Sequence, residues 1–419
     1  MWRYLYSALL YLLTPAIACR LLWRGRRQPE YWQHLAERLG FYPKRPAAPV
    51  LWVHAVSVGE TRAAQPLIEA LQRRWPGYRI LLTGMTPTGR AAGAEVYGDG
   101  LDQVYLPYDY PPAVDRFLRH FSPVFGVLME TEIWPNLLAA CQRRQVPVVL
   151  ANARLSARSA RGYQRFSALL RPAFAALAGA AAQSAADAER LQALGVGAVD
   201  VCGNLKFDVS PPADKLALGA QWRLALAGRA VWLAASTRQG EEALILAAWR
   251  QLALRDSLLV IVPRHPQRFA EVADLLVNER IPFARRSDRL PQPADAVWLG
   301  DSMGEMVAYY ALAELAFIGG SLAPLGGQNL IEAAACACPV LLGPHTFNFQ
   351  RASEDAVAAG AARRVADASE LLRAVNALLT DKKATALMRT AAADFAATHR
   401  GATQRTVSFI AQRALPAAH

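Results

Sequence analysis

The sequence predicts two doubly wound α/β domains of similar size, preceded by an N-terminal membrane anchor helix. From Val50 onward, short apolar runs alternate with longer stretches of helical periodicity, which is typical of a parallel sheet. The alternation stops near residues 202–207, and Ser210-Pro211-Pro212 indicates a linker. The first 28 residues differ from both halves, because they combine a long uncharged segment with a cluster of arginines.

Length and composition agree with this fold class. A chain of 419 residues is long enough for two or three folding units. Hydrophobic residues make up 53% and charged residues 19%, which excludes a disordered chain or a solenoid of charged helices. The five cysteines form no CxxC pair, and such a scattered set suits a reducing compartment.

The N-terminal segment has the order of charges expected for an uncleaved anchor. Residues 4–19 carry no charge, and extension to Trp23 gives about 30 Å of helix, just enough to span a bilayer. Most of the arginines follow the apolar segment, whereas a secretory signal carries them in front of it. We therefore expect residues 1–28 to form an anchor with a basic collar, and the rest to lie on the cytoplasmic side of the membrane. Pro15 and the marginal length also allow a helix lying in the interface.

The net charge points to the same membrane surface. The chain has 46 Lys and Arg against 34 Asp and Glu, a balance of +12. Residues 1–46 contain eight basic and two acidic residues, a balance of +6, which is half of the total. The basic residues of this segment are Arg3, Arg20, Arg24, Arg26, Arg27, Arg38, Lys44 and Arg45. Because the excess lies beside an apolar anchor and no aromatic-basic recognition motif appears, we expect an anionic membrane surface and no nucleic acid as partner.

Eight apolar runs are predicted to be strands of the two sheets. We place the first domain at 29–207 and the second at 208–385, followed by a helical segment at 386–419. The predicted strands are 50–56, 78–83, 123–129 and 147–151 in the first domain, and 231–235, 257–262, 313–318 and 339–342 in the second.

Ligands of open α/β sheets bind beyond the carboxyl ends of the strands, and here these ends are polar and rich in Gly and Pro. No GxGxxG follows a strand, and neither GxxxxGK[ST] nor HExxH occurs. Dinucleotide oxidoreduction, Walker-type phosphate transfer and zincin chemistry therefore have no support in the sequence. An Asp-x-Asp pair is also absent, so we expect neither a cofactor nor a metal.

Five motifs occur in order along nearly the whole chain: HAVSVGE at 54–60, METEIWPN at 129–136, GNLKFD at 203–208, VPRHP at 262–266 and GGQNLIE at 326–332. Together they resemble the motifs of the Kdo (3-deoxy-D-manno-octulosonic acid) transferase family. The resemblance implies a GT-B fold, in which two Rossmann-like domains face a central cleft, and a return of 386–419 to the first domain. It also implies an inverting, metal-independent transfer of Kdo from CMP-Kdo to the lipid A precursor (lipid IVA) in lipopolysaccharide core biosynthesis.

The resemblance assigns the role of general base to Glu60. Inversion at an anomeric carbon is a single displacement, which needs one base for the proton of the acceptor hydroxyl and a group that stabilises the leaving phosphate. An alternative without catalysis exists, since Ser57-Val58-Gly59-Glu60 also fits a capping box in which Glu60 merely closes a helix start.

Glu130 and Lys206 are assigned help to the transition state by the same resemblance. Glu130 and Glu132 lie two residues apart at a strand end, so one can cap the helix that follows while the other takes part in catalysis. Lys206 suits this role because its flexible ammonium group can interact with the negative charges of both the phosphate and the sugar carboxylate of the donor during the reaction. The alternative for Lys206 is a solvated lysine at the domain junction.

The second domain is expected to hold CMP. Arg264 and His265 follow a buried strand, where a guanidinium can bind phosphate bidentately. The Gly-rich segments 319–321 and 326–329 lead to a helix expected near Leu330, whose free N–H groups would bind an anion. The donor-binding candidates are Ser236, Arg238, Arg264, His265, Met303, Gly304, Glu305, Asn329, Leu330, Ile331 and Glu332. Purely structural alternatives remain, because 301–305 can simply start a helix, and Asn329 with Glu332 resembles a cap.

Arg154, Arg158, Arg161 and Arg165 recur at spacings that place them on one helical face. A solvated stripe and a surface for lipid phosphates both fit this pattern.

Two other functions are compatible with the sequence. One is a membrane-associated GT-B glycosyltransferase that uses a UDP-sugar and a different lipid acceptor. The other is an anchored protein that binds anionic lipid or nucleic acid without catalysis.

Overall fold

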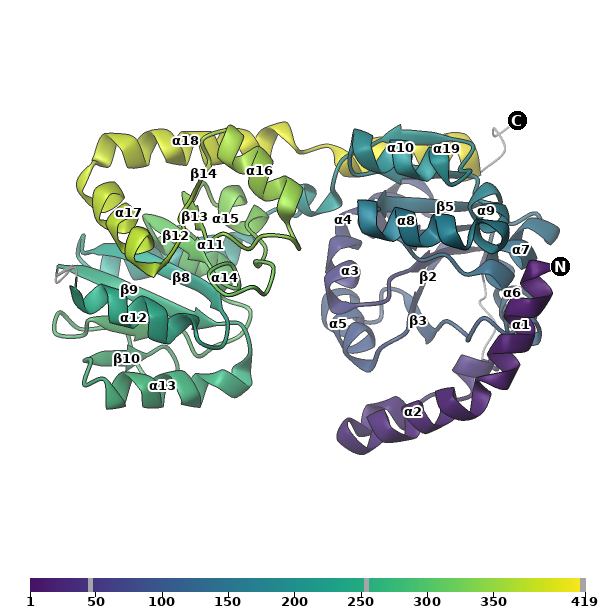
Figure 1. The fold of residues 1–419 in the computed structure, drawn as a ribbon, viewed down its shortest axis with the longest axis horizontal. Helices are drawn as coiled ribbons and strands as arrows, with labels where there is room; N and C mark the ends of the chain where they lie inside the picture. The colour runs from purple at the N-terminus through teal and green to yellow at the C-terminus, as the bar shows by residue number, and fades with distance from the viewer. Residues whose placement is uncertain (44–47, 252–255, 415–419) are drawn as a thin grey trace. The chain divides into compact units, whose positions relative to one another are not determined.

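The computed structural model describes residues 1–43, 48–251 and 256–414, which form two compact units (Figure 1). The first unit comprises Met1–Val209 together with Arg400–His419, and the second comprises Ser210–His399. The predicted boundary at 207/208 lies two residues from the observed one. The predicted segment 386–419 begins within a helix of the second unit, and only the part from Arg400 onward belongs to the first. Lys44 and Arg45, which we counted with the basic collar, lie outside the described residues.

The first unit contains a seven-stranded parallel sheet in the order β3-β2-β1-β4-β5-β6-β7. Its strands are β1 Val50–His54, β2 Arg79–Gly84, β3 Asp102–Tyr105, β4 Phe125–Met129, β5 Val148–Ala153, β6 Gly179–Ala182 and β7 Val199–Val201. Strands β1 and β4 are neighbours although two strands lie between them in sequence. All four strands predicted for this domain are confirmed, whereas β3, β6 and β7 were missed because they are short and rich in polar residues or alanine.

Both faces of this sheet are buried, as expected for strands that are apolar along their whole length. Val50 and Trp52 pack into one cluster, whereas Leu51 and Val53 pack into another on the opposite face. The helices that cover the sheet are α3 Val58–Ala63, α4 Gln65–Arg74, α5 Pro87–Tyr97, α6 Pro111–Phe121, α7 Pro135–Arg143, α8 Ala157–Arg165, α9 Ser167–Ala175 and α10 Ala185–Ala193. The doubly wound arrangement predicted from the sequence is therefore confirmed for this unit.

Two N-terminal helices replace the single anchor helix that we expected. They are α1 Trp2–Leu12 and α2 Thr14–Arg27, and Pro15 lies at the start of α2, where it cannot donate a hydrogen bond to the preceding turn. No single described helix is long and apolar enough to cross a membrane; α1 and α2 meet that test only as a pair, with a bend of 50° between them. On the side facing the unit, Ser7 lies within hydrogen-bonding distance of Asn136 of α7, and Tyr11 stacks on Tyr110.

The second unit repeats the architecture with a sheet in the order β10-β11-β9-β8-β12-β13-β14. Its strands are β8 Ala230–Thr237, β9 Ser257–Pro263, β10 Phe283–Arg285, β11 Val297–Leu299, β12 Leu315–Ile318, β13 Val340–Leu342 and β14 Ala362–Arg364. Its helices are α11 Ala213–Ala225, α12 Glu241–Gln251, α13 Phe269–Asn278, α14 Met306–Leu312, α15 Ile331–Ala335, α16 Gln350–Ala358, α17 Ala368–Thr380 and α18 Lys382–Thr398. The four strands predicted here are confirmed, and the three that were missed, β10, β11 and β14, have only three residues each.

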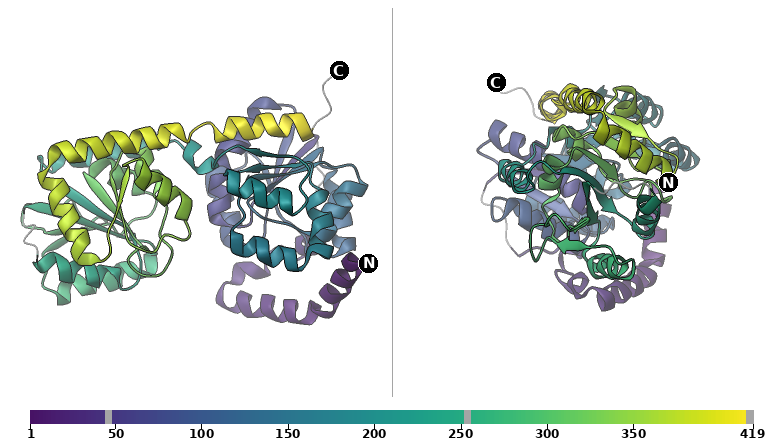
Figure 2. Two further views of the ribbon diagram at one scale, coloured as in Figure 1. Left: turned by 45° about the horizontal axis from the view of Figure 1, so that its top comes forward. Right: turned by 90° about the vertical axis from the view of Figure 1, so that its left-hand side faces the viewer.

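The chain returns to the first unit in its last helix, α19 Ala402–Ala414, which Figure 2 shows beside the helices of that unit. Val407, Phe409 and Ile410 fill the hydrophobic cluster on the face of β1 that carries Leu51. The carboxylate of Asp208, in the 3-10 helix η3 Leu205–Asp208, accepts hydrogen bonds from the N–H groups of Gly401 (2.6 Å) and Thr403.

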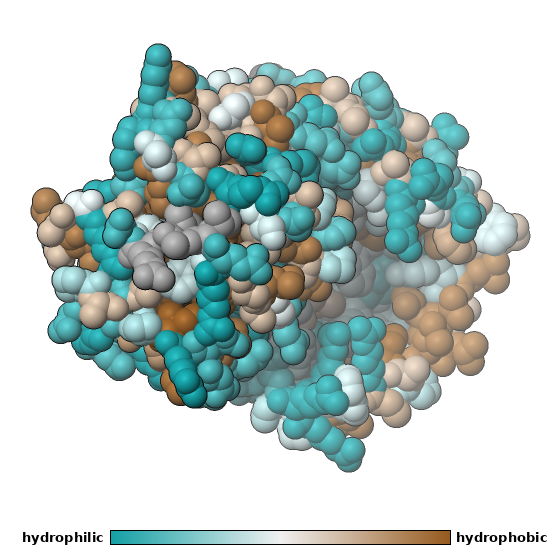
Figure 3. Space-filling model, turned by 60° about the vertical axis from the view of Figure 1, so that its left-hand side comes forward, coloured by the Kyte–Doolittle hydropathy of each residue, from teal (hydrophilic) through white to brown (hydrophobic). Residues whose placement is uncertain are grey.

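On the face of the molecule drawn in Figure 3, hydrophilic residues are interspersed with smaller hydrophobic patches.

The packing of β1 against β4 generates a stability prediction. A Cβ atom on Gly126 would lie 2.5 Å from Cε3 of the fully buried Trp52 ring. Gly126→Ala should therefore lower the free energy of unfolding by about 1–3 kcal/mol, the usual cost of overpacking. Urea unfolding monitored by circular dichroism measures the change. Gly77→Ala is the matched control, because a Cβ atom at that position would meet no heavy atom within 4 Å and its φ is not in the left-handed region; equal effects of the two variants would contradict the prediction.

Candidate active site

The polar residues predicted from the first domain gather where its sheet changes winding direction. The chain leaves β1 toward β2 on one side, and leaves β4 toward β5 on the other, so the two connections diverge and leave a crevice at the carboxyl ends. Residues 57–60 follow β1, and residues 130–132 follow β4. The topology therefore brings Glu60 and Glu130 to the same end of the sheet.

Glu60 and Ser57 form a capping arrangement at the start of α3, in which the carboxylate bonds the N–H one residue before the N-cap. Ser57 is the N-cap and accepts a hydrogen bond from the Glu60 N–H at 3.3 Å. In return, the Glu60 carboxylate accepts from the Val56 N–H and from the Ser57 hydroxyl, both at 2.9 Å. The structural role that the sequence left open for Glu60 is thus present, and it fixes the position of the carboxylate.

The environment of Glu60 favours its protonated form. The pKa of Glu60 is raised from 4.5 to about 7. Burial is the main cause, and the nearby carboxylates of Glu130 and Glu132 act in the same direction, whereas the hydrogen bonds from Val56 and Ser57 lower the pKa. The pKa of Glu132 is also raised, mainly by burial, while the Trp134 indole N–H donates to this carboxylate at 3.0 Å. Three carboxylates thus share one end of the sheet.

Glu130 and Lys206 form an ion pair beside Glu60. The Nζ atom of Lys206 lies 3.7 Å from a carboxylate oxygen of Glu130. Glu130 adopts a left-handed backbone conformation, with φ of 56°, and its N–H donates to the Ala151 carbonyl of β5 at 2.9 Å. Because a residue other than glycine rarely adopts this conformation, the turn after β4 holds its backbone under strain, as is common at functional sites. The three residues predicted to be catalytic therefore lie together in the first unit.

Asn152 is a residue of this site to which no role was assigned from the sequence. It lies near the end of β5, is fully buried, and also has a left-handed backbone with φ of 52°. Its side-chain oxygen accepts from the Leu205 N–H at 3.1 Å, next to Lys206. A buried amide directly beyond an apolar run was the available signal, since such a group must find partners.

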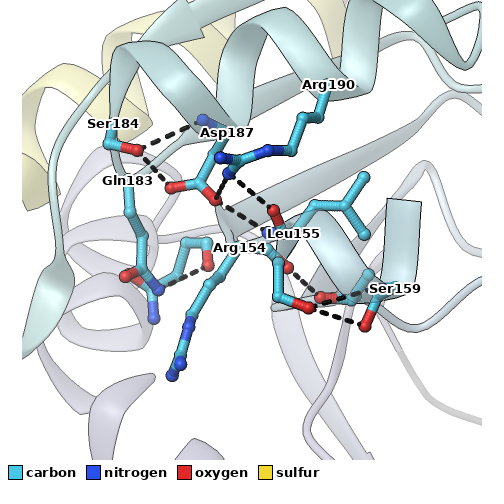
Figure 4. A network of polar contacts seen from close by, with 10 residues as sticks. Arg154, Leu155, Ser159, Gln183, Ser184, Asp187 and Arg190 are labelled. Atoms are coloured by element: carbon cyan, nitrogen blue, oxygen red, sulfur yellow. Dashed lines mark hydrogen bonds and ion pairs between the residues drawn. The ribbon is translucent and has the colours of Figure 1, made fainter. Parts of the chain in front are cut away.

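The loop after β5 is held from the other side by α10 (Figure 4). The Asp187 carboxylate accepts from the Leu155 N–H at 2.9 Å, and Arg190 donates to the Leu155 carbonyl at 2.9 Å. The Arg154 side chain extends away from this network in Figure 4, while its carbonyl accepts from the Thr131 hydroxyl. The loops that follow β4 and β5 are therefore joined at Thr131 and Arg154.

The second unit has its own change of winding direction, between β8 and β12, and a buried carboxylate occupies it. Glu241, fully buried at the start of α12, accepts hydrogen bonds from the N–H groups of Arg238 (2.9 Å) and Gly320 (2.6 Å). It also accepts from Leu322 at 3.0 Å and from Ala323 at 3.3 Å. Glu241 was not among the residues predicted from the sequence, although an acidic residue in the first turn after a strand is a usual cap position.

Several N–H groups in and next to the Gly-rich segments have partners within the unit. The Glu241 carboxylate accepts from the N–H groups of Gly320, Leu322 and Ala323. The N–H groups of Gly327 and Gln328 donate to the carbonyls of Gly320 and Gly319. These contacts fix the loops that lead to α15.

Basic side chains surround His265 in the second unit. Arg264 donates to the Gln328 side-chain oxygen at 3.3 Å, and its N–H donates to the Thr237 carbonyl at 3.0 Å. The pKa of His265 is lowered, mainly by burial and then by the charges of Arg238, Arg264 and Arg268. Ser236, which precedes these groups on β8, has a left-handed backbone with φ of 54°. The structure thus brings Arg238, Arg264 and His265 together.

The other donor-binding candidates make local contacts. Glu305 pairs with Arg286 at 2.9 Å and accepts from the Ser302 hydroxyl, whereas Met303 is exposed and Gly304 has φ of 78°. The side chain of Asn329 accepts from the Ile331 N–H and donates to Glu332, each at 3.0 Å, and Leu330 is buried. These contacts match the capping alternative for Asn329 and Glu332, since α15 begins at Ile331 and Glu332 lies in its first turn.

Within the residues that the structure describes, no group of three or more His, Cys, Asp or Glu side chains is placed to hold a metal ion. The cation that accompanies the carboxylates near Glu60 is the ammonium of Lys206, which pairs with Glu130.

Comparison with known proteins identifies close relatives of this chain. The family model described as 3-deoxy-D-manno-octulosonic-acid transferase matches residues 33–209. A 3-deoxy-D-manno-octulosonic acid transferase of Bordetella pertussis is 45% identical, with 97% of this chain and 98% of the relative covered. The enzyme of the same description from Haemophilus influenzae is 39% identical, with 98% of each covered.

Solved structures with little sequence identity show the same fold. A glycosyltransferase from Rickettsia africae superposes with a TM-score of 0.62 at 11% identity, covering 89% of this chain and 100% of that one. A UDP-GlcNAc 2-epimerase from Neisseria meningitidis superposes with a TM-score of 0.59 at 16% identity, covering 87% and 100%.

The raised pKa of Glu60 predicts a pH-dependent stability. Since the pKa is about 7 in the folded chain against an ordinary value of 4.5, the stabilisation due to the protonated group is complete below pH 4.5 and is lost as pH rises through 7. Glu60→Gln removes this titration. Between pH 5 and pH 8, the stability of the unaltered protein should therefore fall by roughly 2 kcal/mol relative to the variant.

Urea unfolding of both proteins at pH 5 and pH 8 measures this difference. The control is Glu189→Gln, which changes an exposed carboxylate of the same unit. A stability difference between the unaltered protein and Glu60→Gln that is the same at both pH values would contradict the raised pKa.

Proposed function

The chain belongs to the 3-deoxy-D-manno-octulosonic acid (Kdo) transferase family, and we propose that it transfers Kdo from CMP-Kdo to the lipid A precursor by a single, inverting displacement. Kdo transfer in lipopolysaccharide core biosynthesis follows from the relatives, which cover nearly the full chain. The donor, the acceptor lipid IVA, the inversion and the independence of a metal are the parts that we propose. The observation that carries them is a base with a pKa near 7 beside the Glu130–Lys206 ion pair.

Glu60 is suited to remove the proton of the acceptor hydroxyl. A general base works best when its pKa lies near the operating pH, and burial brings Glu60 to about 7. The hydrogen bonds from Val56 and Ser57 hold the carboxylate in one orientation before the acceptor arrives. In the reaction, the hydroxyl oxygen bonds to the anomeric carbon of Kdo, the hydroxyl proton goes to Glu60, and the bond to the CMP phosphate breaks.

Lys206 and Glu130 would control charge during this step. The ammonium can stabilise negative charge on the sugar carboxylate and on the leaving phosphate, and Glu130 keeps the ammonium in place at 3.7 Å. Asn152 supports the pair indirectly, since its buried side chain holds the backbone of Leu205 next to Lys206.

The second unit would bind the CMP portion of the donor. Arg238 and Arg264 provide positive charge near His265, and guanidinium groups suit the oxygens of a phosphate. Glu241 positions this region, because its carboxylate holds the backbone of Arg238 and of the loop after β12. Glu332 would accept from ribose hydroxyls, and Met303, Gly304, Glu305, Leu330 and Ile331 would border the nucleotide.

The N-terminal helices would place the enzyme at the cytoplasmic face of the inner membrane. The exposed large side chains of α1 include Trp2, Tyr4, Leu5 and Leu9. Arg24, Arg26 and Arg27 lie in the last turn of α2. Exposed aromatic and apolar groups next to arginines are characteristic of a helix that lies in the interface of an anionic membrane.

Replacement of the base should separate binding from chemistry. Glu60→Gln should retain affinity for CMP-Kdo and lose at least about 100-fold in transfer rate, because general-base catalysis contributes roughly 10²–10⁴-fold. The assay incubates the protein with CMP-Kdo and a tetraacylated lipid A precursor, and mass analysis of the lipid gives the product. Glu189→Gln on the same unit is the control. Near-normal turnover of Glu60→Gln would rule out Glu60 as the base.

Donor competition distinguishes a CMP-sugar from a UDP-sugar. CMP should inhibit transfer, whereas UDP at the same concentration should not. Arg264→Ala should raise the KM for CMP-Kdo about tenfold, equivalent to the loss of one charge-assisted hydrogen bond. Arg373→Ala, an exposed residue of α17, is the control in the same unit. Stronger inhibition by UDP than by CMP would contradict the proposed donor.

A further inference from the structure

The segment after the catalytic carboxylates has an unusual charge distribution. The 54 residues from 133 to 186, between Glu132 and Asp187, contain no Asp or Glu. The same segment contains seven arginines: Arg143, Arg144, Arg154, Arg158, Arg161, Arg165 and Arg171. A positive region of this size next to the candidate base requires an explanation, because it attracts anions to the place where the acceptor would react.

Helix α8 presents three of these arginines on one side. Arg158, Arg161 and Arg165 follow one another at spacings of three and four residues, and all three are exposed. The opposite side of α8 faces the core, where Ala160 is buried and Tyr163 packs against Phe174. Among the described residues, none of the ion pairs includes Arg158, Arg161 or Arg165. Arg154 precedes the helix and its cap Ser156, so it does not share this face as the sequence suggested.

This arginine face begins at the loops that carry the catalytic groups. The Thr131 hydroxyl, between Glu130 and Glu132, donates to the Arg154 carbonyl two residues before the cap of α8. Tyr163 of α8 is close enough to Glu132 for that carboxylate to raise its pKa, although burial contributes more. The Leu155–Asp187–Arg190 network fixes the start of the helix (Figure 4).

The other end of α8 leads toward the N-terminal helices. Phe166, directly after Arg165, is 65% exposed. Helix α9, which follows, contacts both α8 and α1 within the first unit. Within the first unit, α8, α9 and α1 are therefore linked in this order (Figure 1). The arginines of α8 and the exposed ring of Phe166 lie between the loops of the catalytic carboxylates and the helix whose apolar side chains are exposed.

We propose that Arg158, Arg161 and Arg165 bind the phosphate groups of the acceptor lipid, and that Phe166 lies against its acyl portion. This site rests on the proposed function, because it takes the acceptor to be a phosphorylated lipid. Guanidinium groups bind phosphate through paired, charge-assisted hydrogen bonds, and an exposed ring next to them fits a ligand that is anionic at one end and apolar at the other. Anionic headgroups of the membrane carry the same chemistry. The junction with the loops of Glu130 and Glu132 favours the acceptor, which must reach these groups.

The test measures binding of the acceptor without the donor, in micelles of nonionic detergent. Arg158→Gln/Arg161→Gln should raise the Kd for the tetraacylated lipid A precursor about tenfold and weaken the salt dependence of binding. Arg73→Gln/Arg74→Gln, which removes two exposed arginines from α4, should leave this Kd unchanged. Phosphatase-treated precursor should bind equally weakly to the unaltered protein and to the α8 variant.

Three results would overturn the proposal. The first is an unchanged Kd of the α8 variant for the phosphorylated precursor. The second is a loss that persists with the phosphatase-treated precursor. The third is a variant that loses binding only to acceptor-free vesicles containing phosphatidylglycerol, which would assign the arginines to membrane headgroups. Because no donor is present, these outcomes are independent of turnover, whereas failure of the unaltered protein to transfer Kdo would contradict the proposed function itself.

Discussion

The divergence of two neighbouring parallel strands is the constraint on which the rest of this structure depends. In each unit the connections turn away from each other at one point, between β1 and β4 in the first sheet and between β8 and β12 in the second. Backbone groups at these points have no strand to continue their hydrogen bonding, so side chains must satisfy them. Glu60, Glu130 and Glu241 all lie there. The carboxylates of Glu60 and Glu241 accept from backbone N–H groups of loops, and the N–H of Glu130 donates to the backbone of β5.

Glu241 and Glu60 both accept hydrogen bonds from backbone N–H groups, but with different consequences for function. Glu241 is fully buried and accepts four backbone N–H bonds, which makes it part of the framework of the second unit. Glu60 accepts one backbone bond and one hydroxyl bond and keeps a pKa of about 7, so it can still exchange a proton. Glu241 thus serves to hold the loops of its unit, whereas Glu60 remains available for proton transfer.

The central features of the fold could be predicted from sequence, because buried parallel strands are continuous apolar runs. The eight apolar runs that we predicted to be strands are strands, including β13 with only three residues. The missed strands β10 and β14 are equally short, but arginines interrupt their apolar pattern. Pro15 was noticed in the sequence, but the bend that it accompanies depends on how α1 packs against α7, which a local pattern does not contain. For the site, residues at strand ends were predictable by position. The occupation of the Gly320 N–H by Glu241 was not, since it joins residues 79 apart.

The Asp208 contact has a consequence for biosynthesis of the chain. Asp208 lies at the exit from the first unit and binds the backbone just after the re-entry at Arg400, so the second unit is an insertion whose two ends meet at one point. Ala402, Val407, Phe409 and Ile410 of α19 complete a core cluster whose other members lie between residues 51 and 205. On the ribosome, the first half of the chain emerges with this cluster incomplete, and the cluster is completed only when the last helix has been synthesised. The inserted unit is complete earlier, so vectorial synthesis favours its folding before the unit that encloses it in sequence.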